Sequence, residues 1–146
     1  MQIFIDADGC PVTDLTIRLA KQYGVKCMVV CDTAHEILRP GVETVTVSKG
    51  ADSVDFALVN RIGAGDLVVT QDYGLAAMCL SRRAIPIHQD GMIYTNDNID
   101  SLLFFRAAAR KIRNAGGRLK GPSARTRVQD QTFAATLEQL LREVCP

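Results

Sequence analysis

The chain has 146 residues and a formal net charge of +1, with 47% hydrophobic residues, 23% charged residues and no Trp. This length suits one compact domain spanning residues 1–146, and the composition excludes a chain that is disordered, fibrous or membrane-embedded. Because no apolar run reaches the ~20 residues of a bilayer span and residues 1–6 lack the features of a signal peptide, we expect a cytoplasmic protein.

The first half of the chain alternates apolar runs with a helical pattern. Pro11 suits the first turn of a helix and Gly24 follows the last apolar residue of the pattern, so a helix joins two strands there. In chain order we expect a strand at 1–6, a helix at about 11–23, strands at 25–31 and 42–47, and a short helical turn within 32–39.

The second half continues this alternation and ends in two longer helices. We expect a helix at about 52–62, a strand at 67–70, a helix at 72–83, a strand at 84–88, a short strand or turn at 91–95, and helices from residue 96 or 97 to about 114 and at 126–144. The strand and helix order predicts a three-layer α/β/α fold around a mainly parallel sheet, with residues 97–146 as a basic helix-loop-helix part packed on it.

Five aspartates follow predicted strands on the side of the sheet where α/β proteins place their sites. That side is the crevice beyond the carboxyl ends of the strands, near the point where strand order reverses. The five residues are Asp6 and Asp8 after the first strand, Asp52 and Asp55 after the third, and Asp72 after the fourth. Grouped like charges are costly unless a cation neutralises them, so the sequence predicts a Mg²⁺ or Mn²⁺ site.

Such a metal site suits the hydrolysis of phosphate esters. Mg²⁺ held by few carboxylates keeps waters and open positions, which serve to position a water and to stabilise a leaving oxygen. We expect Asp6 to be the central ligand, with Asp72, Asp55 and Asp8 completing the shell directly or through water, and Asp52 as the alternative to Asp55. One of these carboxylates would accept a proton from the attacking water.

Helix capping is the alternative interpretation of these aspartates. Asp is favoured at helix starts, where three of the five stand. Capping does not account for Asp6, which ends an apolar strand and is soon followed by Asp8. Two further residues are expected outside the site: Asp66 opens its strand and so faces the opposite edge, and Asp32 is expected to be solvated or a cap.

The small net charge hides an asymmetry along the chain. Residues 1–100 hold 8 basic and 13 acidic residues, whereas residues 101–146 hold 9 and 3. Between positions 106 and 127 there are eight basic residues and no acidic one: Arg106, Arg110, Lys111, Arg113, Arg118, Lys120, Arg125 and Arg127. This stretch would supply phosphate contacts to RNA or another nucleic acid, and a solvated helix face is the alternative. Thr70 and Tyr73 are the other expected substrate contacts, to a phosphate and a base.

The five cysteines are expected to be reduced, because their number is odd and the chain is long enough to fold without disulfides. Cys27 and Cys31 lie on one predicted strand about 13 Å apart, too far to bridge. With two His and no CxxC pair, the chain has no ligand set for a zinc finger. Cys10 precedes a helix and is a candidate nucleophile, with packing as the simpler interpretation.

Several sequence blocks resemble the YaiI/YqxD family of bacterial proteins. The segment IDADGCPV at residues 5–12 is similar to the family signature DADACPV, with Gly9 in place of the commoner Ala. The blocks SKGADSVD at 48–55, GDLVVTQDYGLA at 65–76 and YTNDNI at 94–99 also look like those of the family, as does Gly121-Pro122 with Asp130. The resemblance spans nearly the whole chain.

The resemblance implies a PIN-like domain, because the family is placed with PIN-like proteins. Many of these are Mg²⁺-dependent ribonucleases with acidic residues at the carboxyl edge of the sheet. Carried onto this sequence, the first acid is Asp6, the middle one is Asp55 or Asp52, and the late one is Asp72. Asp8 has no PIN counterpart.

Three functions compete at this point. The first is a metal-dependent nuclease of PIN type. The second is a haloacid-dehalogenase-like phosphatase, because residues 6–9 resemble its first motif, although Asp66 and Asp72 are six residues apart along a strand instead of adjacent. The third is a non-catalytic module that binds RNA or a protein on the same scaffold.

Overall fold

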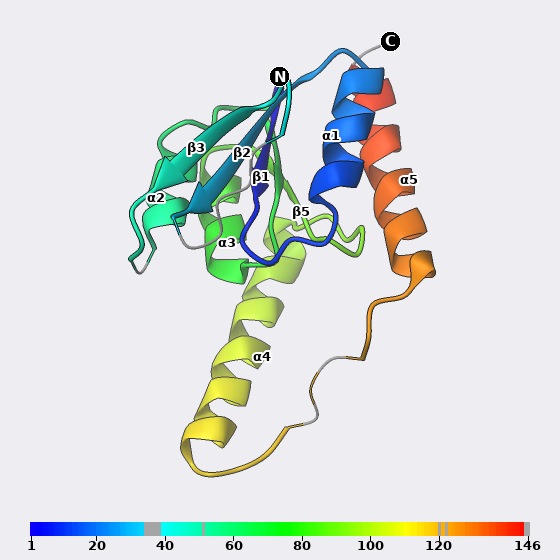
Figure 1. The fold of residues 1–146 in the computed structure, drawn as a ribbon. Helices are drawn as coiled ribbons and strands as arrows, with labels where there is room; N and C mark the ends of the chain where they lie inside the picture. The colour runs from blue at the N-terminus through cyan, green and yellow to red at the C-terminus, as the bar shows by residue number, and fades with distance from the viewer. Residues whose placement is uncertain (34–38, 51, 120, 122, 145–146) are drawn as a thin grey trace.

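A five-stranded sheet forms the centre of the structure, a computed structural model that describes residues 1–33, 39–50, 52–119, 121 and 123–144. The strand order is β3-β2-β1-β4-β5, and all four neighbouring pairs are parallel (Figure 1). The strands are β1 (Gln2–Asp6), β2 (Lys26–Asp32), β3 (Glu43–Val47), β4 (Leu67–Val69) and β5 (Ile85–Ile87). The prediction of a mainly parallel sheet is confirmed.

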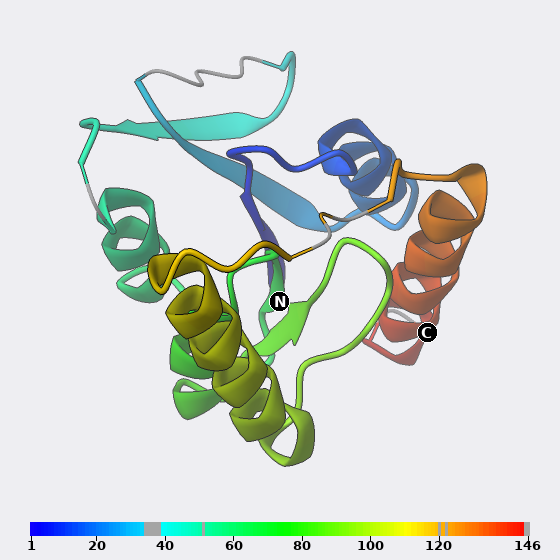
Figure 2. The same ribbon diagram turned by 90° about the horizontal axis from the view of Figure 1, so that it is seen from below.

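Helices cover both faces of this sheet. The described helices are α1 (Thr13–Gln22), α2 (Ser53–Val59), α3 (Tyr73–Ser81), α4 (Asn96–Asn114) and α5 (Arg127–Val144). One apolar cluster joins the sheet to α1 and α5, and a second joins it to α2 and α3. The view from the carboxyl edge shows these two helix layers on opposite sides of the strands (Figure 2). The predicted three-layer α/β/α architecture is therefore confirmed.

The alternating direction of side chains along each strand explains how a single sheet contributes to both apolar clusters. In β1, Ile3 and Ile5 belong to the cluster with α1 and α5, whereas Phe4 between them belongs to the cluster with α2 and α3. Because successive side chains of a strand point to opposite faces, a strand covered on both sides must be apolar at every position. This is the reason that β1 reads as a continuous apolar run.

Helix α4 lies outside the two layers and packs on α3. Its first turn is fixed by a capping box, in which Thr95 and Asn98 exchange hydrogen bonds between side chain and backbone. Ile99, Leu102 and Leu103 of α4 pack against α3, but the second half of the helix extends beyond the carboxyl edge of the sheet (Figure 1). Residues 104–107 and 110–114 of α4 are all exposed.

Most predicted elements are present with shorter bounds. The helix expected to reach residue 62 ends at Val59, and the short strand or turn expected at 91–95 is a single antiparallel bridge between Ile87 and Ile93. The helical turn expected within 32–39 falls mostly on residues 34–38, which lie outside the described residues. None of the helices described is long and apolar enough to cross a membrane.

Candidate functional site

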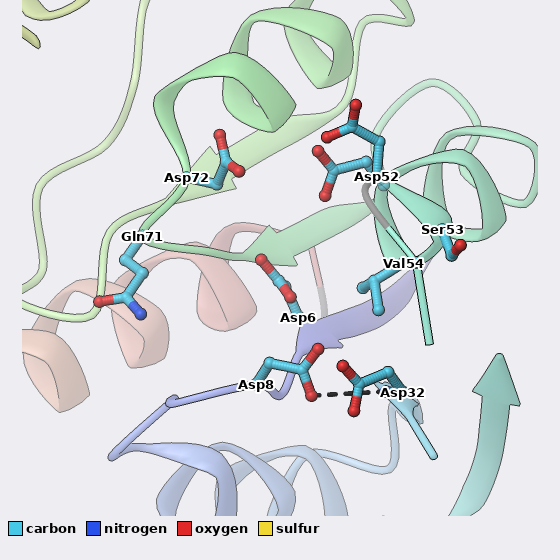
Figure 3. A pocket seen from close by; sticks show the side chains of 10 residues that line it. Asp6, Asp8, Asp32, Asp52, Ser53, Val54, Gln71 and Asp72 are labelled. Carbon is cyan, nitrogen blue, oxygen red and sulfur yellow. Dashed lines mark hydrogen bonds between the residues drawn. The ribbon is translucent and has the colours of Figure 1, made fainter. Parts of the chain in front are cut away.

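A cavity of about 370 Å³ opens at the carboxyl edge of the sheet, and most of its wall is acidic. We call it the acidic cavity. Its lining residues in the described chain are Asp6, Asp8, Asp32, Gly50, Asp52, Ser53, Val54, Asp55, Gln71 and Asp72. Figure 3 shows these side chains arranged around a common space, with Asp6 near its centre. The five aspartates predicted for the site are all present, and none of the lining residues is basic.

The sheet topology explains why these aspartates meet. Strands β2 and β3 lie on one side of β1, and β4 and β5 lie on the other, so the strand order reverses between β1 and β4. Asp6 ends β1, and Asp72 follows β4 across this reversal. Parallel α/β sheets bind ligands at such a point, because the loops after the two strands diverge there.

A buried threonine connects the two sides of the reversal. The Thr70 hydroxyl donates to Oδ2 of Asp6 at 2.8 Å, and its oxygen accepts the backbone N–H of Asp72 at 3.0 Å. The Tyr94 hydroxyl donates to the Thr70 carbonyl at 3.1 Å. Thr70 is only 1% exposed and does not line the cavity. The Thr70 hydroxyl therefore orients Asp6. It is not placed to make the contact to a phosphate in the cavity that the sequence had led us to expect.

Burial and neighbouring charges raise the pKa of Asp6 well above its ordinary value. Burial raises the pKa of Asp6 from 3.8 to about 7; the hydrogen bond from Thr70 opposes this rise, and the neighbouring carboxylates, Asp55 first among them, add to it. Burial also raises the pKa of Asp55 to about 6, with contributions from Asp72 and Asp52 and an opposing one from Arg106. The cavity thus holds two carboxyls that ionise near neutral pH.

Helix capping, the alternative interpretation of the cavity aspartates, fits Asp72 but not Asp52. Oδ1 of Asp72 accepts the backbone N–H groups of Gly74 at 2.8 Å and Leu75 at 3.2 Å, so Asp72 caps α3 while it lines the cavity. Asp52 makes no capping hydrogen bond, and its φ of 63° places it in the left-handed region, which Asp adopts only infrequently. Capping therefore explains the position of Asp72 but leaves Asp52 unexplained.

The donor atoms of the cavity suit a hard divalent cation. Among the described residues, no group of three or more His, Cys, Asp or Glu side chains is placed to hold a metal ion. Mg²⁺ commonly binds proteins through one or two carboxylates and keeps several waters. The acidic cavity offers carboxylate oxygens and space for water, so its residues fit that mode of binding and do not form a closed all-protein cage.

Sequence reasoning missed three polar side chains that line the cavity, namely Asp32, Ser53 and Gln71. Asp32 was expected to be solvated or a cap, but it ends β2 and its backbone N–H donates to Oδ1 of Asp8 at 3.4 Å (Figure 3). The position of Asp32 at the end of a predicted strand was the signal that could have identified it, once β2 is known to adjoin β1. The prediction that Asp66 lies at the opposite edge of the sheet is confirmed. Its carboxylate accepts the backbone N–H groups of Gln2 and Gly63 there.

The basic stretch contains residues in three different situations. Arg106 lies nearest the cavity, with its Nη1 3.5 Å from Oδ1 of Asp72. The exposed residues are Arg110, Lys111 and Arg113 on α4, Arg118 after it, and Arg127 at the start of α5. Arg125 makes ion pairs with Asp90 at 2.6 Å and Asp130 at 2.8 Å, so it anchors the segment before α5. Lys120 lies outside the residues that the structure describes.

The two remaining candidates have structural partners. Tyr73, expected near a base, packs edge-on against Tyr94 with ring centroids 6.0 Å apart and does not line the acidic cavity. Cys10 is half-buried, and burial raises the pKa of its thiol, which disfavours the thiolate that a nucleophile needs. Cys27 and Cys31 are buried free thiols in β2, as expected.

Replacing Thr70 by Val is expected to lower the free energy of unfolding by about 1–3 kcal/mol. The substitution keeps the side-chain shape but removes the donor to Asp6 and the acceptor for the Asp72 N–H, leaving buried polar groups unsatisfied. Urea unfolding at pH 7 measures the loss, and Thr70→Ser is the control that keeps the hydroxyl. Equal stability of the Val variant and the wild type would mean that this hydrogen-bonded bridge is unimportant.

Comparison with known proteins agrees with the sequence blocks. A family profile described as "Uncharacterized BCR, YaiI/YqxD family" matches residues 4–143. A "UPF0178 protein" of Exiguobacterium sibiricum is 55% identical over 143 residues, covering 98% of both chains. Proteins of the same name are 49% identical in Ruminiclostridium cellulolyticum, covering 94% of this chain and 90% of the relative, and 43% identical in Clostridium acetobutylicum, covering 97% of each.

No solved structure matches the chain significantly. The likeness to PIN domains therefore remains a prediction, while the sequence matches extend from the first strand to the last helix. On these matches, the chain belongs to the YaiI/YqxD family.

Proposed function

We propose that the protein hydrolyses phosphodiester bonds of RNA in the acidic cavity, with Mg²⁺ or Mn²⁺ as the metal. One observation carries this proposal: six aspartates from four connections line a single open cavity at the reversal of strand order, and two of them have pKa values near neutrality. Concentrating so many carboxylates without basic side chains in the wall is unfavourable unless some of them take up protons or a cation binds among them.

The bound cation would supply positive charge that stabilises the phosphate oxygens during hydrolysis. Asp6 would be the central carboxylate that holds the cation, and Asp55 would accept a proton from the attacking water. A general base is most effective when its pKa lies near the working pH, and the pKa of Asp55 is about 6. Thr70 fixes the orientation of Asp6 through its hydrogen bond, and Asp72 is fixed by its two backbone donors at the start of α3.

The basic residues of α4 supply the reason for choosing a nucleic acid as substrate. Arg106, Arg110 and Arg113 are spaced four and three residues apart, so they share one face of the helix. This face continues the line of Ile99 and Leu103, whose side chains pack against α3. A row of guanidinium groups thus runs from the edge of the acidic cavity outward, where successive phosphates of one strand would lie.

The two alternatives are less well supported by the geometry. A haloacid-dehalogenase-like phosphatase needs a second pair of carboxylates together after a strand, but Asp66 is held by backbone donors at the opposite edge from Asp72. A non-catalytic RNA-binding module would account for the basic row on α4. It would leave the six cavity aspartates without a role, and the experiment below separates it from the enzyme.

The test is cleavage of an end-labelled RNA in the presence of Mg²⁺ or Mn²⁺, followed on a denaturing gel. We expect the wild type to cleave and Asp6→Asn to be at least about 100-fold slower, because Asp6 is the central cation ligand and losing even an outer partner of a metal site costs about 10–100-fold in activity. Asp100→Asn, an exposed change in the first turns of α4, is the matched control and should cleave as the wild type does.

Salt-sensitive RNA binding without turnover in either metal would replace the enzyme by the binding module. Equal cleavage by the wild type and Asp6→Asn would place the active site elsewhere.

A further inference from the structure

A second groove adjoins the acidic cavity and has a different chemistry. It has a volume of about 360 Å³ and is lined mostly by residues of α2, α3 and α4. Its described lining is Asp52, Asp55, Phe56, Asp72, Gly74, Met78 and Arg106, so it shares three aspartates with the acidic cavity. We call it the side groove.

The side groove offers flat apolar surface that the fold itself does not use. Phe56 is 62% exposed although it stands in α2 between Asp55 and residues that pack on the sheet. Met78 of α3 also lines the groove; it is half-buried and packs partly against the core beneath α2 and α3. Exposed aromatic rings are stacking platforms for flat ligands, and a methionine adapts its shape to them.

Polar groups at the rim restrict which flat ligand fits. Arg106 contributes a guanidinium 3.5 Å from Oδ1 of Asp72, at the boundary between the groove and the acidic cavity. At Gly74, a Cβ would stand 3.2 Å from Asp72 Oδ1 and 3.5 Å from Arg106 Nη1, so glycine leaves this boundary open. A ligand that spans both spaces therefore has a planar apolar part for Phe56 and an anionic part for Arg106.

We propose that the side groove is a nucleobase-binding subsite, in which the base stacks on Phe56 while its attached phosphate is held at the acidic cavity by Arg106. The inference rests on the proposed function, because a nucleotide phosphate enters the acidic cavity only if a cation is bound there. A base already stacked inside a duplex cannot occupy the groove, so the subsite selects an unpaired nucleotide next to the cleaved bond. Stacking is tolerant of base identity, since every base has a π-face.

The experiment compares two fluorescein-labelled probes of equal length and charge: a ten-nucleotide oligoadenylate RNA and the corresponding ribose-phosphate chain without bases. Binding is measured by fluorescence anisotropy with Ca²⁺, an oxygen-ligated divalent cation, in place of Mg²⁺ to slow cleavage. All proteins keep Asp6, because the cation that admits the phosphate depends on it, and a denaturing gel checks that the probe stays intact. We expect oligoadenylate to bind about tenfold more tightly than the abasic chain.

Variants separate the base contact from the phosphate contact. Phe56→Ala should remove the preference for oligoadenylate, and Phe56→Tyr should keep it. Arg106→Gln should weaken binding of both probes to a similar degree. The matched control is Phe104→Ala, which removes a phenylalanine of similar exposure, 68%, from α4 outside the groove and should change neither affinity.

The subsite is ruled out if the parent protein binds both probes equally or binds neither, or if Phe56→Ala keeps the preference. Loss of the preference in Phe104→Ala also contradicts it. These outcomes are independent of catalysis: cleavage without any effect of Phe56 would reject the subsite alone. Conversely, Phe56-dependent binding of the base in a protein whose wild type never cleaves RNA would reject the hydrolytic function alone.

Discussion

Mn²⁺ is expected to raise the Tm of the wild-type protein by about 8 °C when present at about 100 times its dissociation constant, and to leave the Tm of Asp6→Asn unchanged. A ligand that binds only the folded state at this concentration adds about 2.7 kcal/mol to the free energy of unfolding. For a domain of this size, each kcal/mol shifts the Tm by about 3 °C. Asp6 is the carboxylate nearest the centre of the acidic cavity, so its loss should affect cation binding most (Figure 3).

The measurement is thermal melting followed by circular dichroism during titration with Mn²⁺ and then Mg²⁺. Asp100→Asn removes an exposed carboxylate of α4 and should respond to the cations as the wild type does. An equal rise in Tm for Asp6→Asn would show that the cation binds elsewhere. If the Tm of none of the three proteins responds to the cations, the aspartates do not form a cation site. The binding-module alternative would then gain support.

Without metal, the wild type is expected to lose stability as the pH rises from about 4 to 8, and Asp6→Asn is expected to lose much less. The pKa of Asp6 is about 7 in the folded protein and 3.8 in the unfolded chain, so folding favours the protonated carboxyl. This contribution is fully present below pH 3.8 and disappears as the pH rises through about 7. The difference between these pKa values sets an upper limit of about 4 kcal/mol.

Asparagine stands in for the protonated acid and can still accept the hydrogen bond from Thr70. We therefore expect Asp6→Asn to be more stable than the wild type at pH 8 by about 2–4 kcal/mol, and to match it within about 1 kcal/mol at pH 4. Urea unfolding in EDTA measures both differences. A variant that is less stable than the wild type at pH 8 would contradict the pKa assigned to Asp6.

The sequence was a good guide to the layers of the fold because its apolar patterns follow directly from burial. Strands such as β1 and β4 are buried on both faces, and they therefore read as unbroken apolar runs. Asp6, Asp55 and Asp72 could be grouped for the same reason, since all three follow or adjoin the carboxyl ends of predicted strands. Grouping these three aspartates at one edge of the sheet needed only the assumption that the strands are parallel.

The residues that were missed depend on facts that local patterns do not contain. Asp32 joins the site because β2 pairs with β1, and strand order is a long-range property. Arg125 belongs to the basic stretch by composition, but it is held by Asp90, which is 35 residues away, and by Asp130.

Crystals grown with Mn²⁺ and measured for its anomalous scattering would test most directly whether the acidic cavity is a cation-dependent site. We predict a strong anomalous peak inside the cavity, bonded to a carboxylate oxygen of Asp6, that disappears in crystals of Asp6→Asn. An ordered Mn²⁺ bound elsewhere, or a cavity containing only water in crystals at millimolar Mn²⁺, would contradict the proposed function.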